Sequence, residues 1–466
     1  MTTRILGHAI SRISSTTSAY ERTESTSGEP AKLAFALLWL FTFVGFGRPE
    51  DLFPAVGLLH LTLVSAVSAL VAYLGTMLIG RARFVWSREL VLAFLLTGWF
   101  VVGLPFAYWR GGSFEVLTQT WTRTLIFFFL LTQTLTTVNR VRQILWAVLL
   151  SQLIASSASV LLQGKPSLEQ GDRLAGVSQG LLGWNFLGIT FSVTLPFLAA
   201  LYVSKRSTPR AALLIAVLGS TMWMLILTAS RGGFFGIIVS IALTWWFILR
   251  GSSRGRRVSV LLSLCLLIAV AKAPDVFWSR LQTTWSSSAS PIDSDAASAE
   301  ESTTGRKILL ENSLKYTAEF PVFGVGIGGF SVYNGQKVGR PDAWLGTHNT
   351  FTQLSSEAGV PALALFLWLL FTTLARMKKV NIELGGDEES AELRLLARAT
   401  RVSILAFAFG GFFAHIAYAY LFYYVAGIAA GLWTISRRRI KAHEPASVLS
   451  LSGASTISSD LSFKWR

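Results

Sequence analysis

Residues 211–249 read AALLIAVLGSTMWMLILTASRGGFFGIIVSIALTWWFIL and contain two apolar runs that are separated only by Ser-Arg-Gly-Gly. A bilayer core of about 30 Å is crossed by a helix of about 20 apolar residues, which is close to the length of each run. Lipid offers no hydrogen-bond partner to the backbone, so such runs must be helical. This stretch predicts two membrane-spanning helices with a very short connection.

Similar runs recur along the whole chain. Of its 466 residues, 52% are hydrophobic and only 14% are charged, whereas a soluble domain carries about 25% charged residues. We therefore expect an all-α, polytopic integral membrane protein of about twelve transmembrane helices in a single domain over residues 33–436. Eleven or thirteen helices remain alternatives. The predicted helices lie at 33–47, 54–80, 89–108, 116–137, 141–163, 180–203, 210–229, 232–249, 258–273, 358–375, 402–418 and 420–436.

The net charge of +16 comes largely from Lys and Arg in short connectors. Connectors at residues 81–88, 204–210 and 250–257 are the most informative, because basic short loops stay on the cytoplasmic side. The same rule puts both chain ends inside, as a disordered tail over 1–32 and a basic, Ser-rich tail over 437–466. Nothing near the N-terminus has the apolar core of a signal peptide. This distribution of charge argues against nucleic-acid binding.

One long loop, about residues 274–357, is predicted on the extracytoplasmic side. Its Ser-rich part, residues 285–304, is expected to be mobile. Residues 306–320 predict an amphipathic helix on the outer surface, ended by Pro321. The glycines that follow do not fit G-x-x-x-x-G-K-[ST] and follow no predicted strand, so we exclude a nucleotide site and expect a turn beneath His348.

Three polar segments are predicted to meet on this outer face, at residues 171–188, at 228–236 and in the long loop. They carry Arg173, Asn185, Ser230, Arg231, His348 and Asn349, and Arg306 adds a further cation.

Arg231 is the most informative of these residues. An arginine at the bilayer centre costs roughly 2.5–3.5 kcal/mol, and one interpretation is that it extends to the lipid headgroups. Gly232 and Gly233 favour another, since they open a helix N-terminus whose free N–H groups bind anions. The planar guanidinium also pairs with two phosphate oxygens at once. Taken alone, Arg173 is better explained as a solvated charge, and His348 as an ordinary hydrogen-bonding side chain, although a histidine can act as a general base.

Together these residues resemble the O-antigen ligase and polymerase superfamily of bacterial membrane glycosyltransferases. Matching features follow in order: Arg173, Gly176 and Asn185; Ser230 to Gly233; and PVFGVGIGGF at 321–330, followed by His348-Asn349, Glu357 and Gly359. The last block is the most specific, and the resemblance covers about residues 171–435. Two departures are the wide spacing from Arg173 to Asn185 and the Ser-rich insertion before Arg306.

The resemblance implies a multi-pass protein of the bacterial inner membrane with an extracytoplasmic active site. The donor would be a glycan linked to undecaprenyl pyrophosphate, and the acceptor a second lipid-linked glycan, lipid A-core or a protein hydroxyl. It implies no metal and no cofactor, consistent with a single cysteine, Cys265, and with unclustered histidines. Its implied catalytic residues are His348 as base and Arg173 and Arg231 as pyrophosphate clamp; its implied substrate-binding residues are Arg306, Asn349, Ser230, Asn185 and Glu357.

Among these activities we slightly prefer a polysaccharide polymerase, because nothing in the sequence points to lipid A. A solute transporter is the alternative from another class, since twelve helices is a common transporter count. Transporters carry ionisable groups near mid-membrane, and here only Arg123 and His415 are candidates.

Overall fold

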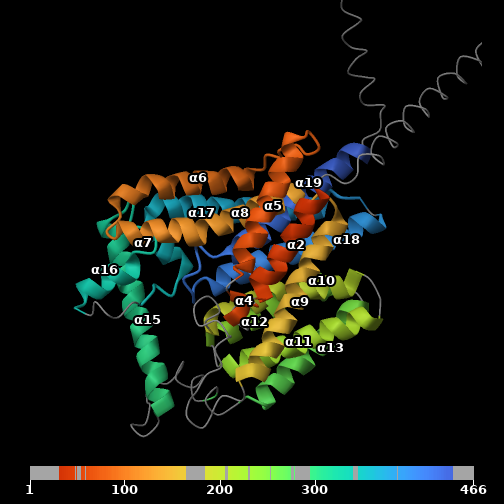
Figure 1. Ribbon diagram of the computed structural model, residues 1–466. Helices are drawn as coiled ribbons and strands as arrows, with labels where there is room; N and C mark the ends of the chain where they lie inside the picture. Colours follow the sequence, from red (N-terminus) through yellow and green to blue (C-terminus); the bar gives the residue numbers. More distant parts are fainter. Residues whose placement is uncertain are drawn as a thin grey trace, which may run out of the picture.

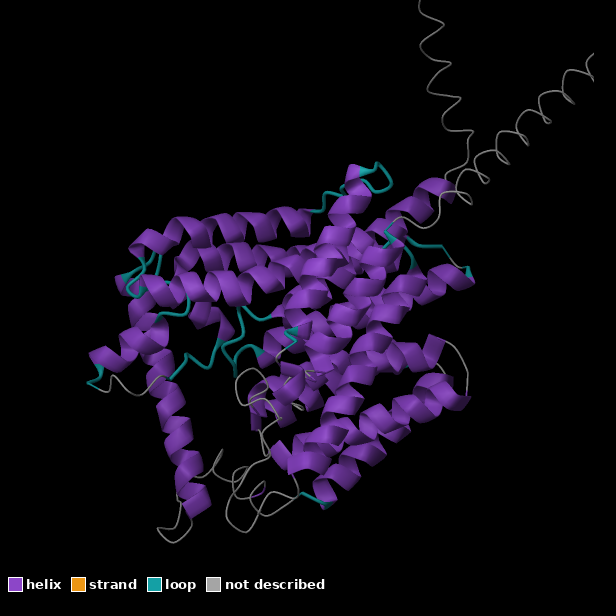
Figure 2. Cartoon of the chain, in the orientation of Figure 1, coloured by secondary structure: helices purple, strands orange, loops and turns teal. Residues whose placement is uncertain are grey.

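The computed structural model describes residues 31–47, 49, 54–57, 59–163, 184–204, 208–228, 231–251, 253–273, 278, 294–339, 345–385 and 387–443. Throughout this part of the chain the regular secondary structure is helical, and no strand occurs in it (Figure 2). The all-α prediction is therefore confirmed for the described residues.

Most predicted spans have a matching helix in the structure. The long helices are α2 (Lys32–Gly47), α5 (Leu61–Leu78), α6 (Arg88–Gly103), α8 (Thr122–Thr134), α9 (Val138–Gln163), α10 (Trp184–Ser204), α11 (Thr208–Thr228), α12 (Arg231–Thr244), α13 (Ser253–Ala271), α17 (Thr350–Glu383), α18 (Glu388–Gly410) and α19 (Tyr420–His443). Shorter elements are α4 (Pro54–Gly57), η1 (Leu104–Phe106), α7 (Arg110–Glu115), and the π-helices η2 (Val116–Trp121) and η4 (Trp245–Leu249). Within the described residues, 6 helical segments are long and apolar enough to cross a membrane, so the chain is an integral membrane protein, while the total of twelve spans stays a prediction.

Helix α19 packs closely against α8 within the bundle core. A Cβ atom at Gly427 would lie 2.7 Å from Leu131 Cβ, and one at Gly431 would lie 2.7 Å from Leu135 Cβ. Small residues four apart let two helices approach closely, which is a common packing solution between membrane helices. Elsewhere in the bundle, α18 packs against α10 and α17.

Two helix boundaries near the C-terminus differ from the prediction. Helix α17 begins at Thr350 instead of residue 358 and consists of two helical parts joined at a kink, because Gly359, with φ 83°, has a non-helical backbone. The predicted span from 358 corresponds to the second part, and the helical turns before Gly359 were not predicted. Helix α18 occupies 388–410 where 402–418 was predicted. Its charged first turns were assigned to a cytoplasmic connector, but Glu392 there pairs with Arg142 of α9 at 2.7 Å.

The described connectors gather at two opposite ends of the bundle (Figure 1). One end has the α17–α18 connection and the last turns of α19, joined by ion pairs of Arg437 with Glu383 and of Arg439 with Asp387. The other end has η1, α7, α16 (Phe330–Lys337), residues 345–349 and residues 411–419. The α17–α18 connection thus lies at the opposite end of the bundle from the residues around His348, and the side of the membrane that each end faces stays a prediction.

Helix α15 (Ser294–Glu319) lies outside the bundle at this far end (Figure 1). Its C-terminal half joins the glycine turn and α16 through a small apolar cluster of Leu309, Tyr316, Val325, Phe330 and Tyr333. The expected helix over 306–320 is therefore confirmed. It begins earlier than expected, at Ser294, so part of the segment 285–304 is helical, which suits its content of Ala and Glu. Residues 285–293 lie outside the described residues, and the mobility of this segment stays a prediction.

Candidate functional site

The site is built around His348, which lies just before α17 in an uncommon backbone conformation. Its φ is 51°, a left-handed value that costs a non-glycine residue about 1–3 kcal/mol. The next residue fixes this geometry, because the Asn349 side chain accepts hydrogen bonds from the backbone N–H groups of Phe351 and Thr352 at 2.9 and 3.1 Å. Thr347 Oγ1 also donates to the Asn349 carbonyl at 2.9 Å. Asn349 is therefore the N-cap of α17, and its implied contact with substrate stays a prediction.

A second histidine, His415, contacts the first. The two imidazole centroids are 5.2 Å apart and the ring planes are nearly perpendicular, at 80°. Gly346 makes this contact possible, because a Cβ atom there would lie 2.7 Å from His415 Cε1. His415 belongs to residues 411–419, between α18 and α19, where we had predicted the end of a transmembrane helix.

Hydrogen bonds attach the 411–419 segment to the first turn of α17. The backbone N–H of Thr350 donates to the carbonyl of Gly411 at 2.7 Å, and Thr350 Oγ1 donates to the carbonyl of Ala414 at 2.7 Å. The backbone N–H of Ala417 donates to Gln353 Oε1 at 3.0 Å. These bonds fix His415 relative to His348, although the two residues are distant in the sequence.

The N-terminus of α12 lies against the same segment. A Cβ atom at Gly232 would be 3.0 Å from Phe413 Cβ, so the backbone next to Arg231 approaches the His415 segment closely. At the end of α18, Gly410 packs on Ile189 of α10, where a Cβ atom would be 2.8 Å from Ile189 Cγ1. The N-terminal parts of α10, α12 and α17 therefore converge here, and helix N-termini carry positive partial charge.

Not every predicted site residue can be placed. Arg173 and Ser230 lie outside the described residues, and for Arg231 and Asn185 the structure describes the backbone alone. Arg231 is the first residue of α12 and Asn185 the second residue of α10. Their roles therefore remain predictions, although α12 begins against Phe413 and Ile189 of α10 packs on Gly410.

The surroundings of His348 keep its imidazole neutral. Burial lowers the pKa of His348 from its ordinary 6.5 to about 4, and the neighbouring His415 and Arg306 lower it further. Arg306 lies on α15, so this helix places a positive charge near the histidine pair. Near neutral pH His348 therefore has a free lone pair that can accept a proton.

Glu357 lies elsewhere, under the glycine turn. It is buried, and its two carboxylate oxygens accept hydrogen bonds from the backbone N–H groups of Gly328 at 2.9 Å and Phe330 at 3.3 Å. Gly326 donates to the Glu357 carbonyl at 2.8 Å. The turn, with φ of 64°, 100° and 71° at residues 324, 326 and 328, is therefore built around Glu357 and not beneath His348 as we expected.

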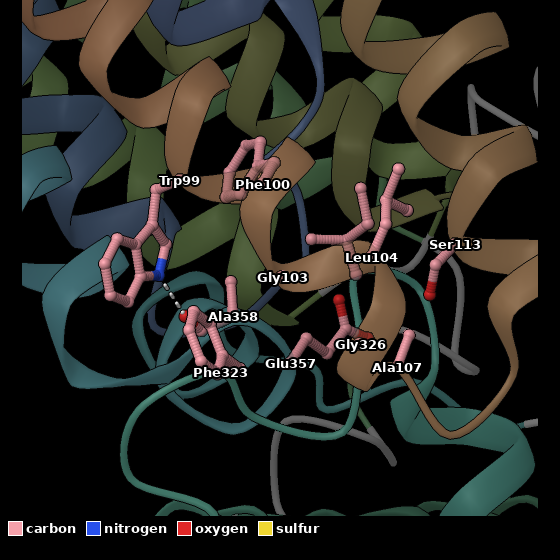
Figure 3. Close-up of a pocket in the computed structure, with 11 residues that line it drawn as sticks. Trp99, Phe100, Gly103, Leu104, Ala107, Ser113, Phe323, Gly326, Glu357 and Ala358 are labelled. Carbon is pink, nitrogen blue, oxygen red and sulfur yellow. Dashed lines mark hydrogen bonds between the residues drawn. The ribbon is translucent and has the colours of Figure 1, made fainter.

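A small pocket beside this turn separates it from α6 (Figure 3). Trp99 Nε1 donates to the carbonyl of Ala358 at 2.9 Å across the kink of α17. Phe323 stacks on Phe106 with ring centroids 4.5 Å apart. Glu357 lines the same pocket, next to Gly326. Its surroundings are therefore packed groups of the protein.

Comparison with known families supports the assignment made from the sequence. Residues 211–367 match the family model described as O-antigen ligase. The chain carries an O-antigen ligase domain. This segment contains Arg231, Arg306, His348, Asn349 and Glu357, and the match supports a membrane glycosyltransferase of the O-antigen ligase and polymerase type. No curated protein matches the chain.

His415 lies outside the matched segment and was absent from the predicted site. The sequence signal was a histidine in the aromatic run FFAHIAYAYLFYY, residues 412–424, which we had interpreted as two adjoining spans. A polar residue within such a run is as consistent with a break between helices as with a charge in mid-membrane.

Proposed function

We propose that this O-antigen ligase domain polymerises glycan from an undecaprenyl-pyrophosphate donor onto a second lipid-linked glycan, at the end of the bundle where His348 lies. The observation that carries the proposal is the contact between His348 and His415 beside the N-terminus of α12. A base and an anion-binding helix terminus are the two groups that such a transfer needs.

The leaving group of this reaction is a lipid pyrophosphate. Its departure from the anomeric carbon increases the negative charge on the phosphate oxygens, and fixed positive groups stabilise this charge. The N-terminus of α12 carries positive partial charge that would attract such an anion, and Arg231 would pair with two of its oxygens. Arg173 would complete the clamp, with Ser230 and Asn185 as further donors.

His348 would accept the proton of the acceptor hydroxyl as that oxygen attacks the anomeric carbon. The hydroxyl oxygen forms the new glycosidic bond while the bond to pyrophosphate breaks, so direct displacement inverts the anomeric centre. A pKa of about 4 makes the free enzyme's His348 a weak base. A bound pyrophosphate favours the protonated imidazole and raises this pKa, so base strength increases when the donor is in place.

The other residues act through these groups. Asn349 caps α17 and orients His348, Glu357 holds the glycine turn, and Arg306 contributes a cation from α15. We keep the prediction that no metal or cofactor takes part, and that the site is extracytoplasmic with both chain ends in the cytoplasm.

The test is complementation of a strain that lacks the protein. His348→Ala and Arg231→Ala should abolish polymer, while His443→Ala and Arg438→Ala at the opposite end should leave it intact. If both site variants make wild-type polymer at equal protein amounts, the assignment is wrong. The gel pattern also separates the activities, since a single-repeat ladder indicates a polymerase and loss of all long chains on lipid A indicates a ligase. Modification of a protein hydroxyl would instead indicate an oligosaccharyltransferase, and solute uptake in proteoliposomes a transporter.

A further inference from the structure

A second polar cavity lies at the opposite end of the bundle from His348. It has a volume of about 810 Å³ and lies between the start of α9, the end of α10, the start of α13 and the first turns of α18. Four arginines line it: Arg142, Arg254, Arg394 and Arg398. Arg398 precedes Gly411 by thirteen residues, which is about 20 Å along a helix, so this cavity is separate from the proposed active site.

The charges in this cavity do not balance. Glu392 is the one carboxylate in its described lining, and Arg142 already occupies both of its oxygens, at 2.7 and 2.8 Å from Nη2. The other three arginines bond neutral acceptors: Arg254 the carbonyl of Val203 at 2.9 Å, Arg394 the carbonyl of Leu384 at 3.1 Å, and Arg398 the Oδ1 atom of Asn381 at 2.7 Å. Among the described residues no carboxylate forms an ion pair with any of these three.

The convergence of these arginines on one cavity is not needed for fixing the orientation of the helices in the membrane. Basic residues that only fix orientation can extend separately into water, whereas here α13 and α18 direct three guanidinium groups toward one cavity. Each group is held by a hydrogen bond, and each retains further N–H donors because a guanidinium has five. Preorganised, planar donors of this kind match phosphate oxygens, often two at a time.

We propose that this cavity binds a phosphate-bearing anion through Arg254, Arg394 and Arg398. Two sources share this chemistry: the headgroup of an anionic phospholipid, for which basic pockets between membrane helices are suited, and a soluble phosphate or pyrophosphate. The site does not depend on the proposed transferase mechanism.

The experiment uses the full chain in detergent and in nanodiscs. Native mass spectrometry counts phospholipid bound during titration with phosphatidylglycerol or with neutral phosphatidylcholine, and thermal unfolding is followed with added inorganic phosphate or pyrophosphate. Retention and stabilisation by phosphatidylglycerol alone identify a lipid headgroup, and stabilisation by the soluble anions identifies the free ion. If neither source binds more tightly than phosphatidylcholine, the proposal is wrong.

Variants localise the site. Arg394→Gln with Arg398→Gln should weaken anion binding roughly 30-fold, since each arginine near an anionic headgroup contributes about 1 kcal/mol. The matched control is Arg438→Gln with Lys441→Gln, two exposed residues at the same end that remove the same charge outside the cavity. If the first pair does not fold, Arg254→Gln replaces it, with an expected loss of about fivefold. Equal binding by cavity and control variants refutes the site.

Discussion

Replacing Arg306 by glutamine tests whether the charges around His348 set its proton affinity. The pKa of His348 is lowered from 6.5 to about 4, first by burial, then by His415 and then by Arg306. Removing the Arg306 charge takes away the smallest of the three contributions, so the pKa should rise but stay below 6.5. His415→Phe removes the larger of the two charge effects while keeping an aromatic ring. The pKa of His348 should therefore rise further in this variant than in Arg306→Gln.

The expected effect is largest at mildly acidic pH. If His348 must be neutral to act, a pKa of about 4 leaves about nine tenths of the free enzyme active at pH 5, whereas a pKa of 6.5 leaves about 3%. Activity at pH 5 relative to pH 7.5 should therefore be near 0.9 in the wild type and should fall between about 0.9 and 0.03 in the variants. Ionisation of the donor does not change this activity ratio, because a doubly esterified pyrophosphate keeps both of its charges between pH 5 and pH 7.5.

The assay is kcat/KM for glycan transfer against pH, measured with purified protein in nanodiscs, since this ratio reports ionisations of the free enzyme. Lys307→Gln is the matched control, because it removes the same charge from the neighbouring, exposed position on α15. A wild-type acidic limb near pH 6.5, or superimposable profiles for the wild type, Arg306→Gln and His415→Phe, would refute the reasoning.

Four further predictions follow from the geometry. Asn349→Ala should lower stability by about 1 kcal/mol through loss of the α17 cap and should also reduce kcat, whereas Ser87→Ala, which removes the cap of α6, should lower thermal stability alone. Gly346→Ala should displace His415 and reduce kcat severalfold, while Gly219→Ala, where a Cβ atom meets nothing within 4 Å, should be neutral in the same assay. Incubation with EDTA should leave transfer unchanged, and restoration of lost activity by a divalent cation would contradict a metal-free mechanism. In a Cys265→Ala background, a membrane-impermeant maleimide should label Val338→Cys and not Lys441→Cys in intact cells, and the reverse pattern would invert the orientation.

The sequence predicted the helices well because lipid imposes one requirement on all of them. Apolar length alone located α12 and its abrupt start at Arg231. The start of α17 at Thr350 was missed, although its cap, Asn349, is a residue type that often precedes a helix. The errors fall where composition is ambiguous. The charged turns of α18 resembled a connector because their partners, such as Arg142 on α9, are distant in the sequence. The aromatic run around His415 resembled continuous membrane helix, because no local pattern shows that Thr350 and Gln353 will bond to it.

Glu357 illustrates a different limit. A glutamate in a polar block near the membrane surface suggests a substrate contact, and its actual partners are backbone N–H groups of the glycine turn. Backbone donors have no signature in side-chain composition, so the sequence could indicate that Glu357 mattered but not what it would bond. Its environment supports a positioning role for the turn on which α15 and α16 pack.

The environment of His348 also gives the proposed reaction an order of events. Arg306 and His415 both disfavour the imidazolium in the free site, so an acceptor hydroxyl alone meets a weak base. Binding of the donor places two negative charges near the same groups, and opposite charge favours the protonated imidazole. In the proposed mechanism the proton affinity of His348 therefore rises only when the pyrophosphate is present. An acceptor would therefore be deprotonated efficiently only in the ternary complex. Arg306 would have two roles, because it lowers the proton affinity of His348 before the donor binds and also attracts the donor.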